Sequence, residues 1–537
     1  MRKWSFIGVL VLCILGSLLP VSAAPNPDTA VSKGKILFVP HDGRPISDAQ
    51  TADVVRKLGY EVIVPPQELL GNRDDLGHPA ELWAWTEKEI KHVQAAVISS
   101  DSMIYGSLVG SRKHSYEPGE VQERAARFAQ LRQDNPQVRL YVFGSIMRTP
   151  SSGANAGSEE PDYYQTYGSD IFQYTALTDR QETNGLSEKE KQEQKALLQA
   201  IPTAALQDWM GRRAKNFAVN HQLIDMVRNG TFDYLILGKD DNAPYSQTHK
   251  ESRELALYGK GIDATRFQAM TGIDEMGMLL LTRAVNDMTS SKPFICVRYN
   301  QGKGGATVPA YSDERIDKSI HSAVLAAGGM EISSPKKADF VLLVNTNPDG
   351  RTFEANRREN SLLNTGKAKA HTLYFADMVS DAAAAELPVG IADIAYANGA
   401  DNALMRELQK RGLLFKIRAY AGWNTATNSS GFVLGEGMLA AAMSDDARDQ
   451  LLLNRYLEDW GYQANVRTAL MEYFHGLHSD AAYSTMDAMK PEAEAWTSQR
   501  LREFAMVNLP PFAGISTLQL RFPWNRGFEA EITLGQQ

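Results

Sequence analysis

Short apolar runs alternate with helix-length segments along most of the chain. The runs lie at 36–40, 61–64, 95–99, 139–143, 232–237, 294–298, 339–344, 389–392 and 416–420. Many are rich in Val, Ile, Leu and Phe without regular polar positions, which is typical of strands covered on both faces of a parallel sheet. Segments of helical length, such as 48–58 and 319–327, lie between them. The pattern predicts an α/β fold with mostly parallel sheets.

Two arrangements of these elements fit the pattern. We favour two doubly wound domains with a cleft between them, an N-terminal α/β domain over 35–300 and a second over 301–444, joined near the glycine-rich segment 301–309. A (β/α) barrel with insertions is the alternative. A long segment rich in Gln, Glu, Lys and Ala at about 180–228 predicts a helical insertion. Residues 445–537 predict a helical region followed by a C-terminal β-hairpin, whose turn contains Pro523 and Gly527.

The N-terminus has the pattern of a secretory signal. Arg2 and Lys3 precede an apolar run over 6–19, and small residues follow at 22–24. The run is shorter than the roughly 20 residues that span a bilayer. We therefore expect a signal peptide over 1–23, a polar linker over 24–34, and a secreted or extracytoplasmic protein with no stable membrane insertion after cleavage.

Composition narrows the class of protein further. The 537 residues are 43% hydrophobic, enough for a large core, and carry a net charge of −8. The chain has no overall positive charge, so its composition does not indicate a nucleic-acid partner. Loss of 1–23 would remove Cys13 and leave Cys296 alone, so an internal disulfide is excluded in the mature chain.

Polar side chains follow many of the predicted strands. Because ligands bind at the carboxyl ends of parallel strands, we expect these side chains to share one cleft. As substrate-binding candidates we take Asp42, Arg44, Tyr105, Arg112, Arg298, Asp393, Asn398, Asp401, Trp423, Asn424 and Asn428. Tyr105 and Trp423 would offer aromatic faces, and the others hydrogen bonds and charge.

Carboxyl groups near these strand ends favour acid/base chemistry. Two carboxyls held in different environments can act as acid and base on one bond, as in glycoside hydrolysis. The catalytic candidates are Asp101, Asp240, Asp241 and Glu275. Asp240 and Asp241 are adjacent, so we expect different roles for them, one towards the ligand and one holding Lys239, Arg298 or the following turn.

The chain lacks the standard motifs of several enzyme classes. It contains no HExxH, paired CxxC, GxSxG, Walker loop or GxGxxG, which disfavours the usual zinc proteases, α/β-hydrolases and nucleotide enzymes. We expect no cofactor and no metal site defined by spacing. A hard divalent cation held by Asp42, Asp240, Asp241 or Asp393 is the alternative.

Several stretches together resemble the domain-of-unknown-function 4127 family. They include ILFVPHDGRP (36–45), ISSDSMIYGSLVGSR (98–112), EEPDYYQTYG (159–168), YLILGKDDNAPY (234–245), IADIAYANGAD (391–401), AYAGWNTATNSSG (419–431) and PWNRGFE (523–529). The resemblance covers about 35 to 530 and brings no settled activity. It implies that the site residues are the strand-end candidates above, apart from Trp423.

Three functions fit these observations. The first is an exported hydrolase that uses carboxylate acid/base catalysis on a polar substrate, such as a carbohydrate or a cell-wall fragment. The second is a hydrolase dependent on Mg²⁺ or Ca²⁺. The third is a non-catalytic exported protein that binds a small ligand. In each case the expected partner is a small molecule or an oligosaccharide.

Overall fold

The first half of the chain builds a six-stranded parallel sheet. The computed structural model describes residues 1, 32–151, 159–355, 363–476 and 485–535; the predicted signal peptide after Met1 and most of the linker lie outside them. The strands are β1 (Lys35–Val39), β2 (Glu61–Ile63), β3 (Ala95–Ser99), β4 (Arg139–Ile146), β5 (Tyr234–Lys239) and β6 (Phe267–Thr271). Their order across the sheet is β2-β1-β3-β4-β5-β6.

A second, five-stranded parallel sheet follows. Its strands are β7 (Phe294–Tyr299), β8 (Met330–Glu331), β9 (Phe340–Asn345), β11 (Val389–Asp393) and β13 (Ala419–Ala421), in the order β13-β11-β9-β7-β8. When the strands of each sheet are numbered separately, both sheets have the same winding. The second strand lies on one side of the first strand, and all later strands lie on its other side. The predicted α/β fold with mostly parallel sheets is confirmed, and both sheets are open. Strand β7, which precedes the expected boundary at 300, already belongs to the second sheet.

Helices cover both faces of the first sheet. One face packs on α1 (Ala49–Arg56) and α11 (Met276–Met288), and the other on α2, α3, α5, α9 and α10. Alternate strand residues therefore enter two cores, such as Phe38 on one face and Leu37 on the other. The remaining bounds are α2 (Pro79–Glu89), α3 (Ser100–Tyr105), α4 (Leu108–Lys113), α5 (Pro118–Asp134), α7 (Tyr163–Thr183), α8 (Glu188–Ala200), α9 (Thr203–Arg228) and α10 (Gln247–Tyr258).

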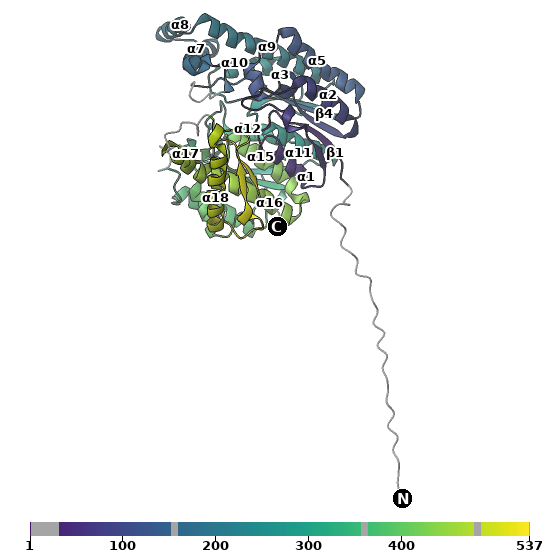
Figure 1. The fold of residues 1–537 in the computed structure, drawn as a ribbon, viewed down its shortest axis with the longest axis vertical. Helices are drawn as coiled ribbons and strands as arrows, with labels where there is room; N and C mark the ends of the chain where they lie inside the picture. Colours follow the sequence, from purple (N-terminus) through teal and green to yellow (C-terminus); the bar gives the residue numbers. More distant parts are fainter. Residues whose placement is uncertain (2–31, 152–158, 356–362, 477–484, 536–537) are drawn as a thin grey trace.

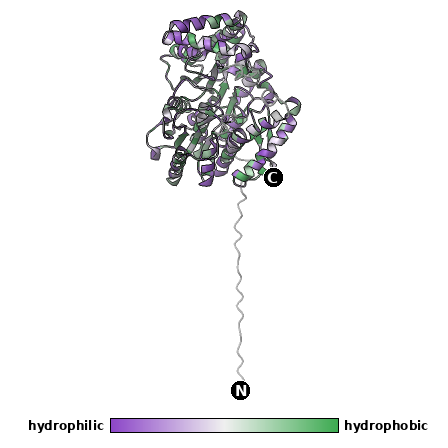
Figure 2. Cartoon of the chain, turned by 90° about the vertical axis from the view of Figure 1, so that its left-hand side faces the viewer, coloured by the Kyte–Doolittle hydropathy of each residue, from purple (hydrophilic) through white to green (hydrophobic). Residues whose placement is uncertain are grey.

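The helices predicted at 180–228 are α8, α9 and the end of α7. Helix α8 buries no residue, and Figure 2 shows the helices at the top of the molecule largely hydrophilic on the outside. The second half of α9 is different, because Leu223 and Val227 enter the core beneath the first sheet. One part of this long segment therefore projects from the molecule, and the other part packs against the first sheet.

The second sheet is covered in the same way. Helices α12 (Ile316–Ala326) and α15 (Ala426–Leu439) pack on one face, while α13 (Ala370–Ala384), α14 (Asn402–Lys410) and the C-terminal helices pack on the other. The predicted C-terminal helical region and antiparallel hairpin are confirmed. They comprise α16 (Asp445–Arg455), the π-helix η9 (Tyr456–Val466), α17 (Arg467–Gly476), α18 (Lys490–Asn508), β14 (Gln519–Arg521) and β15 (Glu531–Thr533).

Short elements complete the fold. Strands β10 (Phe353–Glu354) and β12 (Tyr396–Ala397) form a small parallel pair beside the second sheet. The 3₁₀ turns are η2 (Gln67–Leu69), η3 (Ile90–His92), η5 (Gly304–Ala306), η6 (Pro335–Lys337), η8 (Ala440–Ala442), η10 (Asp487–Met489) and η11 (Ile515–Thr517).

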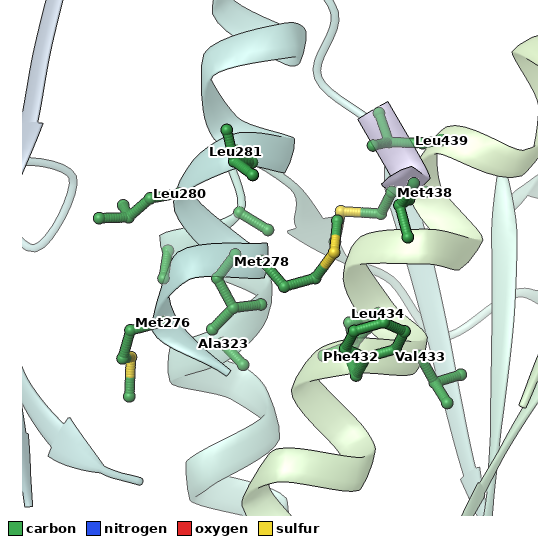
Figure 3. Packing of buried hydrophobic residues seen from close by; sticks show 14 of the residues in the cluster. Met276, Met278, Leu280, Leu281, Ala323, Phe432, Val433, Leu434, Met438 and Leu439 are labelled. Atoms are coloured by element: carbon green, nitrogen blue, oxygen red, sulfur yellow. The ribbon is translucent and has the colours of Figure 1, made fainter. Parts of the chain in front are cut away.

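One hydrophobic core joins the two halves. Helix α11 follows the last strand of the first sheet, α15 follows the last strand of the second, and the two helices pack against each other (Figure 1). Figure 3 shows Met278 of α11 reaching towards α15, where Leu434 and Met438 lie. Gly431 and Gly435 allow this close approach, since a Cβ at Gly435 would lie 2.7 Å from Met278 Cγ and 2.9 Å from Thr282 Oγ1. The halves are therefore held together by buried apolar surface.

We predict that Gly435→Ala destabilises the protein by about 1–3 kcal/mol, because the added methyl group overpacks the contact between α11 and α15. Gly211→Ala is the matched control, since Gly211 also lies within a helix but a Cβ there meets nothing within 4 Å. That change should stabilise the protein by about 0.5–1 kcal/mol. Urea unfolding followed by circular dichroism measures both, and equal stabilisation by the two changes would contradict the packing argument.

Candidate functional site

A cavity of about 600 Å³ lies where the strand ends of the two halves meet. Its wall includes segments that follow β1, β4, β5 and β6 of the first sheet and β11 and β13 of the second, together with the C-terminal region. This is where parallel α/β folds bind ligands. The charged side chains of the wall are Asp42, Glu159, Asp240, Asp241, Asp274 and Glu354, with Arg44, Arg112, Arg148, Arg467 and Arg526.

One group of charges is centred on Arg44. Its guanidinium lies 2.8 Å from Asp42 Oδ2 and 2.6 Å from Asp274 Oδ1, and it is 5.5 Å from the ring centre of Trp524. Asn424, from the second half, also donates to Asp274. Although burial raises the pKa of Asp274, the guanidinium of Arg44 and the ring of His41 lower it well below its ordinary value. The Asp274 carboxylate therefore stays ionised and links the two halves.

A second group contains the adjacent aspartates. Asp240 Oδ2 accepts a hydrogen bond of 2.6 Å from Arg112 Nη2, and Asp241 Oδ2 accepts one of 3.0 Å from Arg148 Nη1. Glu159 connects both arginines, at 2.8 Å from Arg112 and 3.2 Å from Arg148. Each aspartate thus has its own arginine, and both carboxyls reach the same cavity.

The two aspartates differ in environment. The side chain of Asp240 is 6% exposed and paired at 2.6 Å, whereas the side chain of Asp241 is 31% exposed and has the longer contact. Burial and the neighbouring charge of Asp240 raise the pKa of Asp241 to about 6. Two carboxyl groups held in different environments are what acid/base chemistry needs.

Four residues of the cavity wall have a strained backbone. Asp241, Tyr311, Asn398 and Asn424 all line the cavity and all have positive φ angles, of 28°, 63°, 58° and 62°. Residues with side chains adopt this conformation at a cost, so it persists only where surrounding contacts impose it. Here the contacts include the hydrogen bonds from Tyr311 and Asn398 to Glu354, at 2.6 Å and 2.7 Å. Such strain is enriched at functional sites.

The C-terminal region closes the cavity. Arg526 pairs with Glu159 of the first half at 2.6 Å and with Glu529 at 2.5 Å. Arg467, at the start of α17, lies 4.7 Å from the ring centre of Phe528 and donates to Gln463 at 3.1 Å. Within the described ranges no carboxylate pairs with Arg467, and its buried Nε has no hydrogen-bond partner. Burial also lowers the pKa of Arg467.

A family model described as "Protein of unknown function (DUF4127)" matches residues 36–533. The chain belongs to the DUF4127 family. The match covers nearly the whole chain, including every segment that lines the cavity. No curated protein matches this DUF4127 chain.

Among solved structures, the chain is similar to a C2-type ketoreductase from a modular polyketide synthase. The two are 11% identical over 65% of this chain and 88% of that one, with a TM-score of 0.14. A score this low supports no inference about fold or chemistry.

Seven of the residues predicted from this DUF4127 sequence line the cavity together. They are Asp42, Arg44, Arg112, Asp240, Asp241, Asn398 and Asn424. One aspartate was predicted to hold Lys239, Arg298 or the following turn, and the first two of these partners are wrong. Lys239 pairs with Asp313 at 2.6 Å, and Arg298 donates to the Ser333 carbonyl.

The other predicted residues lie behind the cavity wall or away from it. Asp101 accepts from the Ser145 N–H at 2.9 Å, Tyr105 stacks on His114, and Trp423 packs against Phe528. Arg298 is exposed on β7. Glu275 is buried between Gly272 and Gly431, and Asn428 is buried in the first turn of α15.

Asp393 and Asp401 form a separate buried group beneath the π-helix η9. Asn345 donates to both, Tyr420 donates to Asp393, and Asp401 caps α14. Asp393 is therefore apart from the three other aspartates proposed to hold a cation, each of which pairs with an arginine. Among the residues described, no group of three or more His, Cys, Asp or Glu side chains is arranged to hold a metal ion. No described helix has the length and apolar character needed to cross a membrane.

The structure adds residues that the strand-end analysis missed. Arg148 and Asp274 follow β4 and β6, so the same rule could have selected them. Glu159 belongs to a stretch typical of the family, but no strand precedes it directly. Arg467, Trp524 and Arg526 come from the C-terminal region, where no periodic signal indicates the cavity.

We predict that Glu275→Gln flattens the dependence of stability on pH. Burial raises the pKa of the Glu275 carboxyl from its usual value of 4.5 to about 8. The folded state thus holds this proton more tightly than the unfolded state, so the contribution to stability is complete below about pH 4.5 and is lost as pH rises to about 8.

The test is urea unfolding of both proteins across this range of pH. The wild-type protein should lose more stability towards high pH than Glu275→Gln. Glu68→Gln, which removes an exposed carboxyl, serves as the control and should keep the wild-type slope. An unchanged slope in Glu275→Gln would show that the carboxyl is not protonated in the folded protein.

Proposed function

We propose that this DUF4127 protein is an exported hydrolase that cleaves a polar, carbohydrate-like or cell-wall-derived substrate by acid/base catalysis. The observation that carries the proposal is the pair Asp240 and Asp241, which reach one cavity from two electrostatic environments. Such a pair supports acid and base roles on one scissile bond. The predicted signal peptide over 1–23 supports export and lies outside the described residues.

The roles follow from the environments. Asp241, whose pKa burial and Asp240 raise to about 6, is assigned as the general acid that protonates the leaving-group oxygen. Asp240, paired with Arg112, is assigned as the base. It takes a proton from water as the water oxygen attacks the carbon and the carbon–oxygen bond of the substrate breaks. One bond is replaced by another, and the two protons end on the leaving group and on Asp240.

The remaining wall residues would hold the substrate. Asn398 and Asn424 present amides to hydroxyl groups, and Trp524 and Phe528 provide apolar faces. Arg467 forms no ion pair with a described carboxylate, although the charges of Glu529 and Glu354 act on it, and so supports a substrate with an acidic group. Since Arg112, Arg148 and Arg526 already pair with protein carboxylates, Arg467 is the guanidinium best placed to bind one from a ligand.

A ligand-binding protein without catalysis is the second candidate. The cavity lies between two halves of the same winding and is lined by residues of both, which supports recognition of a ligand held between them. The two candidates differ in turnover, because both predict binding in the cavity and only the first predicts bond cleavage.

For the hydrolase, Asp240→Asn and Asp241→Asn should each lower kcat/KM by about 10²–10⁴-fold, since each removes one proton-transfer group. A screen of oligosaccharides and cell-wall fragments, followed by assay of reducing ends or released fragments, provides the measurement. Exposed Asp134→Asn should retain wild-type rates. The wild-type rate should fall as pH rises above about 6, where Asp241 loses its proton. Binding without turnover of any substrate would leave the ligand-binding protein as the function.

For the acidic group, Arg467→Gln should raise KM about tenfold or more for uronic-acid oligosaccharides, because a charge-assisted pair is lost. It should leave KM unchanged for neutral oligosaccharides of equal length. Arg467→Lys keeps the charge and should show an intermediate KM. Equal effects on acidic and neutral substrates would mean that Arg467 only shapes the wall.

A further inference from the structure

A second cavity, of about 270 Å³, lies between α1 of the first half and α15, α16 and β15 of the second. No described residue lines both cavities. Its volume is roughly nine times the about 30 Å³ that one water molecule takes in the liquid. The space therefore accommodates a molecule of several heavy atoms.

Glu436 of α15 lines this cavity and is 0% exposed. Neither Oε1 nor Oε2 has a hydrogen-bond partner among the described residues. A buried carboxyl without partners is costly, and native structures nearly always satisfy such groups. The side chain that belongs to the cavity wall therefore has an unsatisfied acceptor group, with no donor in the described chain.

The carboxyl groups around Glu436 outnumber the cations that pair with them. Arg455 of α16 is the one buried arginine there among the described residues, and it already donates to Glu458 and, at 3.3 Å, to Asp459 of η9. Three buried carboxyls thus share one guanidinium. Asp53 of α1 and Glu531 of β15 line the cavity without an ion pair within the described chain, and Arg56 of α1 is exposed and donates to the Val62 carbonyl.

Much of the remaining lining is apolar, beside the polar side chains of Gln50, Asn454 and Thr533. Pro45, Phe432, Leu451 and Ile532 contribute to the wall, so the cavity suits a molecule with a short apolar body as well as a charge. An inorganic ion would leave most of this volume and surface unused.

We propose that the second cavity binds a small organic cation, a primary ammonium or guanidinium on a short apolar chain, whose charged end pairs with Glu436. The ligand would contact α1 from the first half and α15, α16 and β15 from the second, and so would strengthen their association. The site is independent of the hydrolase proposal, because it rests on different residues.

Binding of an organic cation should change the protonation of Glu436, and this change can be measured. Burial raises the pKa of Glu436 to about 8, against the opposing charge of Arg455. Near pH 7 the empty site therefore holds a proton, and a bound ammonium favours the ionised carboxylate. Binding should release a proton, and affinity should increase as pH rises towards 8. The charged neighbours that share this environment are Asp53, Arg56, Arg455, Glu458, Asp459 and Glu531.

The test is calorimetric titration of the purified protein with 1,4-diaminobutane and methylguanidinium, in two buffers with different heats of ionisation. We expect saturable binding with proton release, and a higher melting temperature in the presence of the ligand. Butane-1,4-diol, NaCl and MgCl₂ at matched concentration or ionic strength should give neither effect. A response to the diol or to the salts equal to that of the amines would overturn the proposal.

Glu436→Gln should lower the affinity for the amines about 30-fold or more, because a buried charge pair is lost. The variant should fold, since glutamine has nearly the shape of the protonated carboxyl that the empty site holds near pH 7. Asp53→Asn should lower the affinity less, and Glu407→Gln, which changes a buried glutamate outside both cavities, should keep it. Amine binding that persists unchanged in Glu436→Gln, or absence of binding to the wild-type protein, would overturn the proposal.

Discussion

Burial of α11 against α15 determines how the two sheets face each other. Each helix follows the last strand of its own sheet, and each begins beside the first cavity. When these two helices pack together through Gly431, Gly435 and Met278, the carboxyl edges of both sheets are brought to one place. The cavity exists because of that contact. Apolar packing in the middle of the molecule therefore sets the position of polar groups at the site.

The second constraint is the neutralisation of buried charge. Asp42, Asp240 and Asp241 each pair with an arginine, and most of these pairs cross between segments distant in sequence. Buried pairs of this kind contribute little net stability, but loss of one partner is costly. Their main effect is therefore on conformation. They hold the loops at the strand ends in one arrangement and keep residues with positive φ, such as Asn424, in place. Arg467 in one cavity, which pairs with no described carboxylate, and Glu436 in the other, whose carboxyl has no described hydrogen-bond partner, differ from this background.

The fold was largely predictable because each strand carries its own signal. Runs such as 95–99 and 340–345 are buried on both faces, and a continuous apolar run reflects that directly. Strand order has no such local signal, since it depends on the direction in which each crossover helix turns back, and the shared winding of the two sheets emerged only in three dimensions. The rule of polar strand ends selected Asp42, Asp240 and Asn398 correctly as neighbours. It failed to separate Asp393, because periodicity does not reveal that η9 covers that strand end. It also missed Arg526, which follows β14 in the antiparallel hairpin, where the rule for the ends of parallel strands does not apply.

The wall of the first cavity contains residues from both ends of the chain, so the site can form only late in synthesis. Asp42, the first carboxylate of the cavity, is translated near the beginning of the chain. Trp524, Arg526 and Phe528 come almost five hundred residues later. Until that last segment has left the ribosome, Glu159 lacks its Arg526 partner and the cavity has an open side. A nascent chain therefore holds no complete site, and assembly of the cavity becomes a late, whole-chain event.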